Sequence, residues 1–123
     1  MTLPSNGITA EAIPEVTPPY QLSADLLAAM FAALPAPPAD ATMAWRQTRA
    51  SRLVQAVAAR MPADAVQART ATQIVTVHEA AADTLAMAFA PGLTVRQISA
   101  LRRAGAALAA VGLGLERALV GRR

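Results

Sequence analysis

The sequence predicts an all-α protein: a small helical bundle built on an antiparallel helical hairpin, with an extended Pro-rich N-terminal arm. Apolar residues recur at alternating three- and four-residue steps on both sides of the turn Pro91-Gly92-Leu93-Thr94. This spacing is typical of amphipathic helices. Hydrophobic residues make up 54% of the 123-residue chain, alanine is the commonest of them, and aromatic residues make up only 3%. A sheet core of β-branched and aromatic side chains is therefore not expected.

The two helices of the hairpin are predicted from their apolar seams and their end signals. The pair Asp64 and Gln67 resembles a capping box, so the first helix is expected from Pro62 to about Ala90. Thr94 and Gln97 form the same pair before the second helix. The seam of the first helix comprises Ile74, Val77, Ala81, Leu85 and Ala88. The seam of the second comprises Ile98, Leu101, Gly105, Leu108, Gly112, Leu115 and Leu119, and Gly121 closes it.

The chain before the hairpin divides at its prolines. Residues 1–22 contain four prolines and are expected to form an extended or disordered arm. Residues 23–34 are expected to form a short helix with Ser23 as its N-cap, and residues 35–39 a Pro-rich connector. Asp40 is expected to cap a longer helix that ends near Met61. The domain prediction is accordingly a three-helix bundle over residues 40–123.

Composition restricts the chemistry and the compartment. The chain has no cysteine, which excludes disulfides, a thiol nucleophile and thiolate metal ligands, and makes a reducing, cytoplasmic location the expectation. Residues 1–45 carry a charge of −4 and residues 46–123 a charge of +7, which gives the net +3. The acidic segment is expected to fold back on the basic part, or the basic part to meet an acidic partner.

The outer face of the last helix is the leading candidate for function. Opposite its seam the helix is thinly charged, and a helix that is apolar most of the way round needs a second partner. We expect a non-enzymatic interaction module that self-associates or docks a partner protein through this face. Its predicted residues are Ala106, Ala110, Leu113 and Gly114.

A row of arginines along the second helix gives an alternative. Arg46, Arg49, Arg52 and Arg60 lie along one flank, with Trp45 and Gln55 nearby and no acidic residue between positions 40 and 64. Such a row could bind nucleic-acid phosphates, as an accessory protein would, or rest on an anionic membrane surface. A solvated flank, or pairing with the acidic arm, is the simpler interpretation of the same pattern.

No enzyme, metal or cofactor site is predicted. His78 is the single histidine and is expected to lie at the edge of the apolar face of its helix, without an oriented partner for general base catalysis. Glu79 and Asp83 share a helix face and are expected to be solvated.

Neither apolar stretch of the chain is expected to act as a targeting or membrane segment. The run 26–34 follows an acidic rather than a basic segment, unlike a signal peptide. Residues 104–115 are uncharged, but twelve helical residues cover about 18 Å of the roughly 30 Å of a bilayer core, so a buried helix is expected there.

From Pro62 onward the sequence resembles a group of short bacterial helical proteins of unknown function. Their helix of the type P-x-D-x-x-E-A-x-x-A-x-Q-[MI]-x-x-x-H precedes a short linker and a second Arg-rich helix. The matching residues here are Pro62, Asp64, Ala68, Gln73, Ile74 and His78. Gln67 replaces the acid, and the Gly-rich tail of the group is missing. The resemblance implies the helical hairpin and no particular activity.

Overall fold

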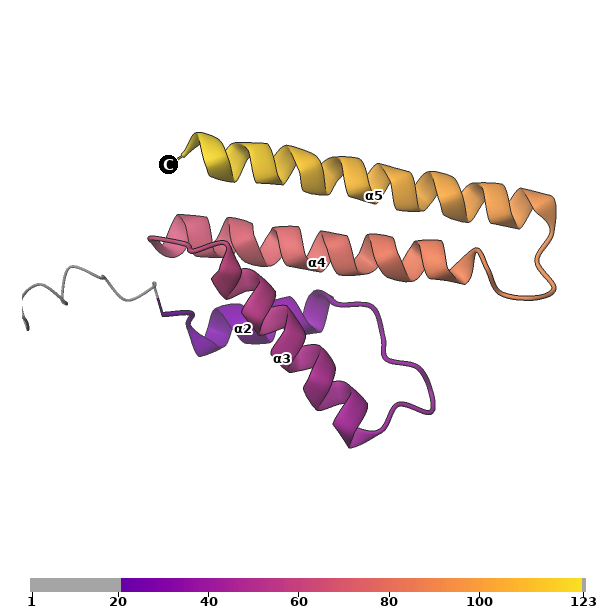
Figure 1. The fold of residues 1–123 in the computed structure, drawn as a ribbon, viewed down its shortest axis with the longest axis horizontal. Helices are drawn as coiled ribbons and strands as arrows, with labels where there is room; N and C mark the ends of the chain where they lie inside the picture. The colour runs from indigo at the N-terminus through magenta and orange to yellow at the C-terminus, as the bar shows by residue number, and fades with distance from the viewer. Residues whose placement is uncertain (1–20, 123) are drawn as a thin grey trace, which may run out of the picture.

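The computed structural model describes residues 21–122 as four helices without a strand in that range (Figure 1). The helices are α2 (Ala24–Ala33), α3 (Met43–Ala59), α4 (Ala65–Met87) and α5 (Val95–Gly121). The predicted all-α fold class is therefore confirmed. The predicted N-terminal arm lies outside the described residues, apart from its last two positions.

The two longest helices, α4 and α5, form the predicted hairpin and run side by side in opposite directions (Figure 1). On α5, Gly105, Gly112 and Leu119 are buried, and Leu101 and Leu115 are half-buried. The three- and four-residue steps of the sequence thus mark the side of α5 that faces α4. The contact between these helices is the most extensive in the described chain.

Local capping residues fix where the short helix and the last helix begin. The Ser23 hydroxyl accepts a hydrogen bond from the backbone N–H of Leu26 at 3.1 Å, as predicted for an N-cap. At the start of α5, the Thr94 hydroxyl accepts from the N–H of Gln97 at 3.1 Å, and the Gln97 side-chain oxygen accepts from the N–H of Thr94 at 2.8 Å. The capping box predicted there is confirmed.

Two other predicted boundaries are wrong by a few residues. The N-cap of α3 is Thr42, whose hydroxyl accepts from the N–H of Trp45, because Asp40 lies inside a turn closed by the Ala41 N–H on the Pro38 carbonyl. Helix α4 ends at Met87 rather than near Ala90, because residues 88–90 tighten into three-residue turns before Pro91.

The hydrophobic core lies where α2 and α3 meet α4. Met30 of α2, Leu53 and Val57 of α3, and Ala71 and Val75 of α4 form one buried cluster. Helix α3 crosses α4 obliquely, whereas α5 covers another side of α4 along most of its length (Figure 1). Helix α4 is therefore the central element, and each of the other three helices packs on it.

Candidate functional site

Close packing brings α5 so near to α4 that a Cβ atom added at either of two positions would overlap an α4 side chain. A Cβ atom added at Gly105 would lie 2.6 Å from the Leu85 side chain, and one added at Gly112 would lie 2.7 Å from the His78 ring. Both distances are shorter than real carbon contacts. The two glycines each cost about 1 kcal/mol of helix propensity, which the closer contact between the helices offsets.

The opposite side of α5 is left uncovered by the described chain. Helix α5 packs along α4, and its side-chain hydrogen bonds to the rest of the described chain lie near its C-terminal end. Arg60, after the end of α3, donates to Glu116 at 2.9 Å, and Arg122 donates to the Thr70 hydroxyl at 2.7 Å. Across the middle of the helix, the described helices cover only the seam.

The structure places all four residues of the predicted interaction face on this uncovered side. Ala106, Ala110 and Gly114 are exposed and recur at four-residue steps, and a Cβ atom at Gly114 would have nothing within 4 Å. Leu113 beside them is 50% exposed. We call these four residues the α5 outer face. Such a row of small residues allows a second helix to approach closely.

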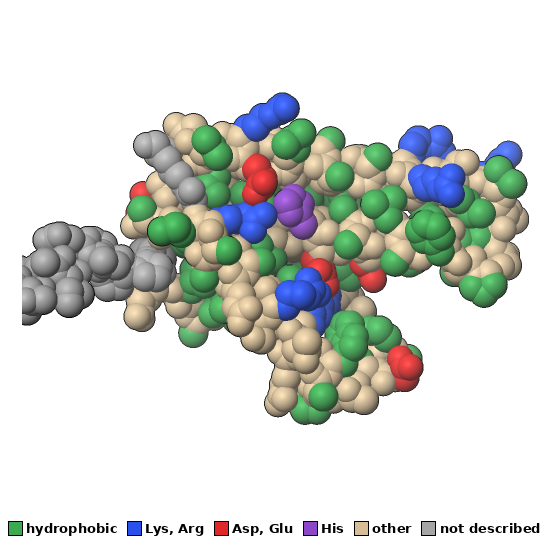
Figure 2. Space-filling view, viewed as in Figure 1, with side chains coloured by type: hydrophobic (Ala, Val, Ile, Leu, Met, Phe, Trp, Pro, Cys, Tyr) green, Lys and Arg blue, Asp and Glu red, His purple; other side chains and the backbone are tan. Residues whose placement is uncertain are grey.

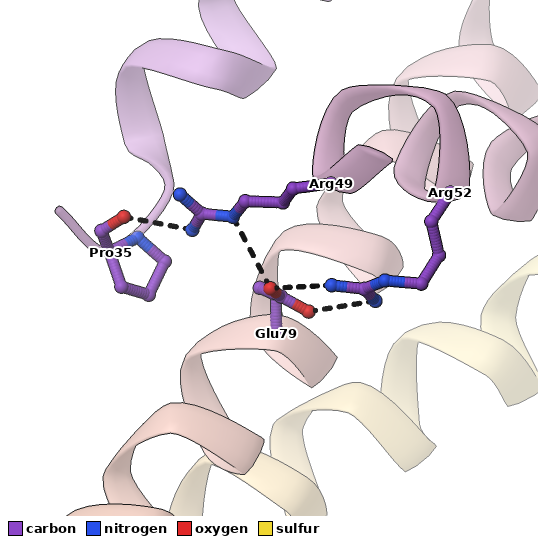
Figure 3. A network of polar contacts seen from close by, with 4 residues as sticks. All are labelled: Pro35, Arg49, Arg52 and Glu79. Carbon is purple, nitrogen blue, oxygen red and sulfur yellow. Dashed lines mark hydrogen bonds and ion pairs between the residues drawn. The ribbon is translucent and has the colours of Figure 1, made fainter. Parts of the chain in front are cut away.

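The predicted arginine row is divided by ion pairs within the chain (Figure 3). Arg49 donates to Glu79 at 3.3 Å and to the Pro35 carbonyl at 2.8 Å. Arg52 donates to both oxygens of Glu79, at 3.2 and 3.0 Å. Since the side chains of Arg49 and Glu79 are only 11% and 17% exposed, this cluster joins α3, α4 and the connector after α2.

The expectation that Glu79 lies on a solvated face is therefore wrong. Its hydrogen bonds and charge interactions with Arg52, supported by those with Arg49, hold the pKa of the Glu79 carboxyl below its ordinary value of 4.5. Partial burial acts against this shift but is outweighed. Within residues 21–122, the acid that binds Arg49 and Arg52 is Glu79 of α4, and the predicted pairing with the N-terminal arm lies outside the described residues.

Trp45 and Arg46, at the start of the predicted row, remain at the surface of α3. The Arg49 guanidinium lies 5.4 Å from the centre of the Trp45 ring, in a cation–π contact. Arg46 is exposed and has no ion pair with any of residues 21–122. The structure thus leaves Arg46 and the exposed part of Arg52 available to an anion, rather than a continuous row of four side chains.

His78 is exposed and lies over Gly112 of α5, at the boundary between α4 and α5. It also lines a small cavity of about 250 Å³ with Arg52, Arg60 and Glu79. In this cavity, both arginines bind glutamates of the same chain. Within residues 21–122, no group of three or more His, Cys, Asp or Glu side chains could hold a metal ion.

Helix α5 differs from the expectation for its uncharged stretch. The stretch 104–115 is part of the 27-residue α5, and the whole helix is long and apolar enough to cross a membrane by length and composition. Only 17% of its most apolar stretch is buried, so α5 is not the buried core helix that the sequence suggested.

A second apolar surface, missed by the sequence reasoning, lies at the turn between α4 and α5. Phe89 and Val95 are each 81% exposed and Met87 is 52% exposed. We call residues 87–96 the hairpin tip. The available signal was the apolar residues on both sides of the Pro91-Gly92 turn, together with the absence of acidic residues from 84 to 115.

Comparison of the chain with protein-family models, with curated proteins and with solved structures finds no match.

Proposed function

We propose that this protein is a non-enzymatic helical interaction module, in which the α5 outer face packs against a helix of a second copy or of a partner protein. One observation carries the proposal: the longest and one of the most apolar helices of the described chain is covered on one side only. The small residues of the α5 outer face point away from the seam and leave open space at Gly114.

Burial of this face gives a favourable free energy of association. Leu113, in the α5 outer face, is 50% exposed. Covering what remains of its surface would contribute on the order of 1 kcal/mol by removal of apolar surface from water. Ala106, Ala110 and Gly114 add little area themselves, but they lower the distance at which a second helix can pack.

Light scattering over a range of protein concentrations tests self-association. The proposal predicts a mass above the 12.7 kDa of one chain. Ala110→Arg places a long charged side chain in the centre of the α5 outer face and is expected to return the protein to the mass of a single chain. Ala32→Arg, at an exposed position of α2, is the matched control and should leave the mass unchanged.

The same variants also test the partner-protein form of the proposal. If the native chain is a monomer, affinity capture from its own cells should recover a partner that Ala110→Arg loses and Ala32→Arg retains. A monomer whose captured proteins are the same for all three chains would contradict the proposal.

A further inference from the structure

The hairpin tip combines exposed apolar side chains with a position at one end of the molecule. Phe89 and Val95 have the greatest exposed fractions among the large hydrophobic side chains of the described residues. They lie on the two sides of the turn, after the end of α4 and at the start of α5. This turn extends beyond α2 and α3 (Figure 1), so none of the core helices covers it. The tip is a convex apolar surface.

The charge around the hairpin tip is positive, and no acidic side chain of residues 21–122 pairs with it. Arg96, Arg102 and Arg103 are exposed, and the chain has no acidic residue from 84 to 115. None of the three forms an ion pair or hydrogen bond with another described residue, unlike Arg49 and Arg52, which bind Glu79. Figure 2 shows arginine and hydrophobic side chains together at this end of the molecule.

The spacing along α5 separates the apolar and basic groups by depth. Arg102 and Arg103 follow Val95 by seven and eight residues, which is about 11–12 Å along a helix. Apolar side chains of interfacial proteins enter the boundary between headgroups and acyl chains to a depth of about 5–10 Å. A tip inserted to this depth would place the two arginines beside the lipid headgroups.

We propose that the hairpin tip binds the surface of an anionic lipid bilayer, with Phe89 and Val95 inserted below the headgroups and Arg102 and Arg103 beside the lipid phosphates. Charge complementarity favours this occupant, because basic residues near a membrane are attracted by anionic lipids. A convex tip fits a deformable surface better than it fits the groove of a folded partner. Nucleic acid would also attract the arginines and would stack a base on Phe89, but it would leave the exposed Val95 and Met87 in water, whereas a bilayer covers all three apolar side chains.

Vesicle co-sedimentation of the full chain tests the proposal. We expect binding to vesicles that contain phosphatidylglycerol, weaker binding to phosphatidylcholine alone, and loss of the difference at high salt. The double variant Phe89→Ser, Val95→Ser should bind about tenfold less. The matched control is Met43→Ser, Val120→Ser, which removes two apolar side chains of similar exposure from other surfaces and should bind like the native chain.

The arginines are tested separately from the apolar residues. The triple variant Arg96→Gln, Arg102→Gln, Arg103→Gln should lose the preference for phosphatidylglycerol, whereas Arg46→Gln on α3 should keep it. Circular dichroism of each variant establishes that the helices are intact, which is expected since every substituted side chain is exposed.

A fluorescence measurement reports insertion directly. Trp45 is the only tryptophan of the chain and lies on α3, away from the hairpin tip. Phe89→Trp in a Trp45→Phe background should shift its emission to shorter wavelength on addition of phosphatidylglycerol vesicles, and native Trp45 should not shift.

Three results would overturn the inference: equal vesicle binding by the Phe89→Ser, Val95→Ser variant and the native chain, an unshifted emission from the Phe89→Trp variant, or binding to oligonucleotides but not to vesicles. Loss of lipid binding in Ala110→Arg, with tip variants unaffected, would also overturn it by assigning the lipid to the α5 outer face. Self-association measured without lipid is independent of all these outcomes, so this inference and the proposed function can fail separately.

Discussion

The two sides of α5 carry the same kinds of small residue with opposite consequences. Toward α4, Gly105 and Gly112 occupy positions where an added Cβ atom would lie under 3 Å from Leu85 or His78. On the other side, a Cβ atom at Gly114 meets nothing within 4 Å. The seam is therefore already packed closely, whereas the α5 outer face has the residues for close packing but no described neighbour.

Helix α4 shows a related contrast between its own two sides. Toward α5 its Leu85 side chain lies against Gly105, and this contact depends on shape. Toward α3 it adds Glu79, which binds Arg49 and Arg52 through hydrogen bonds and charge. Packing of apolar groups does not change with pH, but a carboxylate network does. The two helices that flank α4 should therefore respond differently to acid.

An added side chain should change the stability of the protein most where it distinguishes the two sides of α5. Gly105→Val should lower the free energy of unfolding by about 2–3 kcal/mol, because the new side chain overlaps Leu85. Gly114→Val should change it by no more than about 0.5 kcal/mol, because it enters open space. Urea titration at several protein concentrations measures both and separates any contribution from association. If the two variants lose similar amounts of unfolding free energy, the seam is not closely packed.

Glu79→Gln extends the comparison to the two sides of α4. At neutral pH this variant should lower the free energy of unfolding by about 1–2 kcal/mol, because Arg49 is nearly buried and loses its charged partner. The folded-state pKa of Glu79 lies below 4.5, so its stabilisation is complete above that pH and is lost as the pH falls through the folded-state pKa. The difference in free energy of unfolding between the native chain and the variant should therefore become smaller in acid.

The control for this experiment is Asp83→Asn, one helical turn further along α4. Asp83 is exposed and forms no ion pair with the described residues, so its loss should change stability little at neutral pH. If the difference in free energy of unfolding between the native chain and Glu79→Gln stays constant from neutral pH to about pH 3, that result would contradict the pairing of Glu79 with the two arginines.

Relief of the overlap at Gly105 provides a smaller and more specific effect. Leu85→Ala added to Gly105→Val should recover about 1–2 kcal/mol relative to the sum of the two single variants, because it removes the atoms with which the new side chain overlaps. The measurement is a double-mutant cycle from urea titrations. Strict additivity would place the strain of Gly105→Val somewhere other than Leu85.

The smallest effect is expected at Gly112. A Cβ atom there overlaps the outer end of the exposed His78 ring, which can turn toward solvent. Gly112→Ala also gains about 1 kcal/mol of helix propensity, so we expect a net change within about 0.5 kcal/mol. A loss as large as that of Gly105→Val would show that the His78 ring is held in place.

Local signals in the sequence predict most of the helical framework. The leucine and glycine seam of α5, the N-cap at Ser23 and the capping box at Thr94 each depend on residues within one or two helical turns. The sequence predicts Asp40 as the N-cap of α3, whereas the structure has Thr42. Both residues have side chains suited to this role, and the turn that begins at Pro38 places Asp40 before the helix.

Contacts between helices are harder to predict. Glu79 binds arginines that lie 27 and 30 residues earlier in the chain. These residues come together only because α3 crosses α4 at this point. The exposed hairpin tip has a similar origin, since whether Phe89 is buried depends on how far α2 and α3 extend along α4. Helical periodicity shows which face is apolar, but it does not show whether another helix covers that face.

Hydrogen bonding and apolar spacing act over a few residues, so the amino-acid sequence was enough to predict the helices, the residues of the hairpin seam and the starts of α2 and α5. The packing of whole helices was needed to show that α4 is the central helix, that Glu79 binds Arg49 and Arg52, and that one side of α5 and the hairpin tip stay uncovered. These features depend on the crossing of whole helices, where many small packing contributions, none visible in a local segment, are summed.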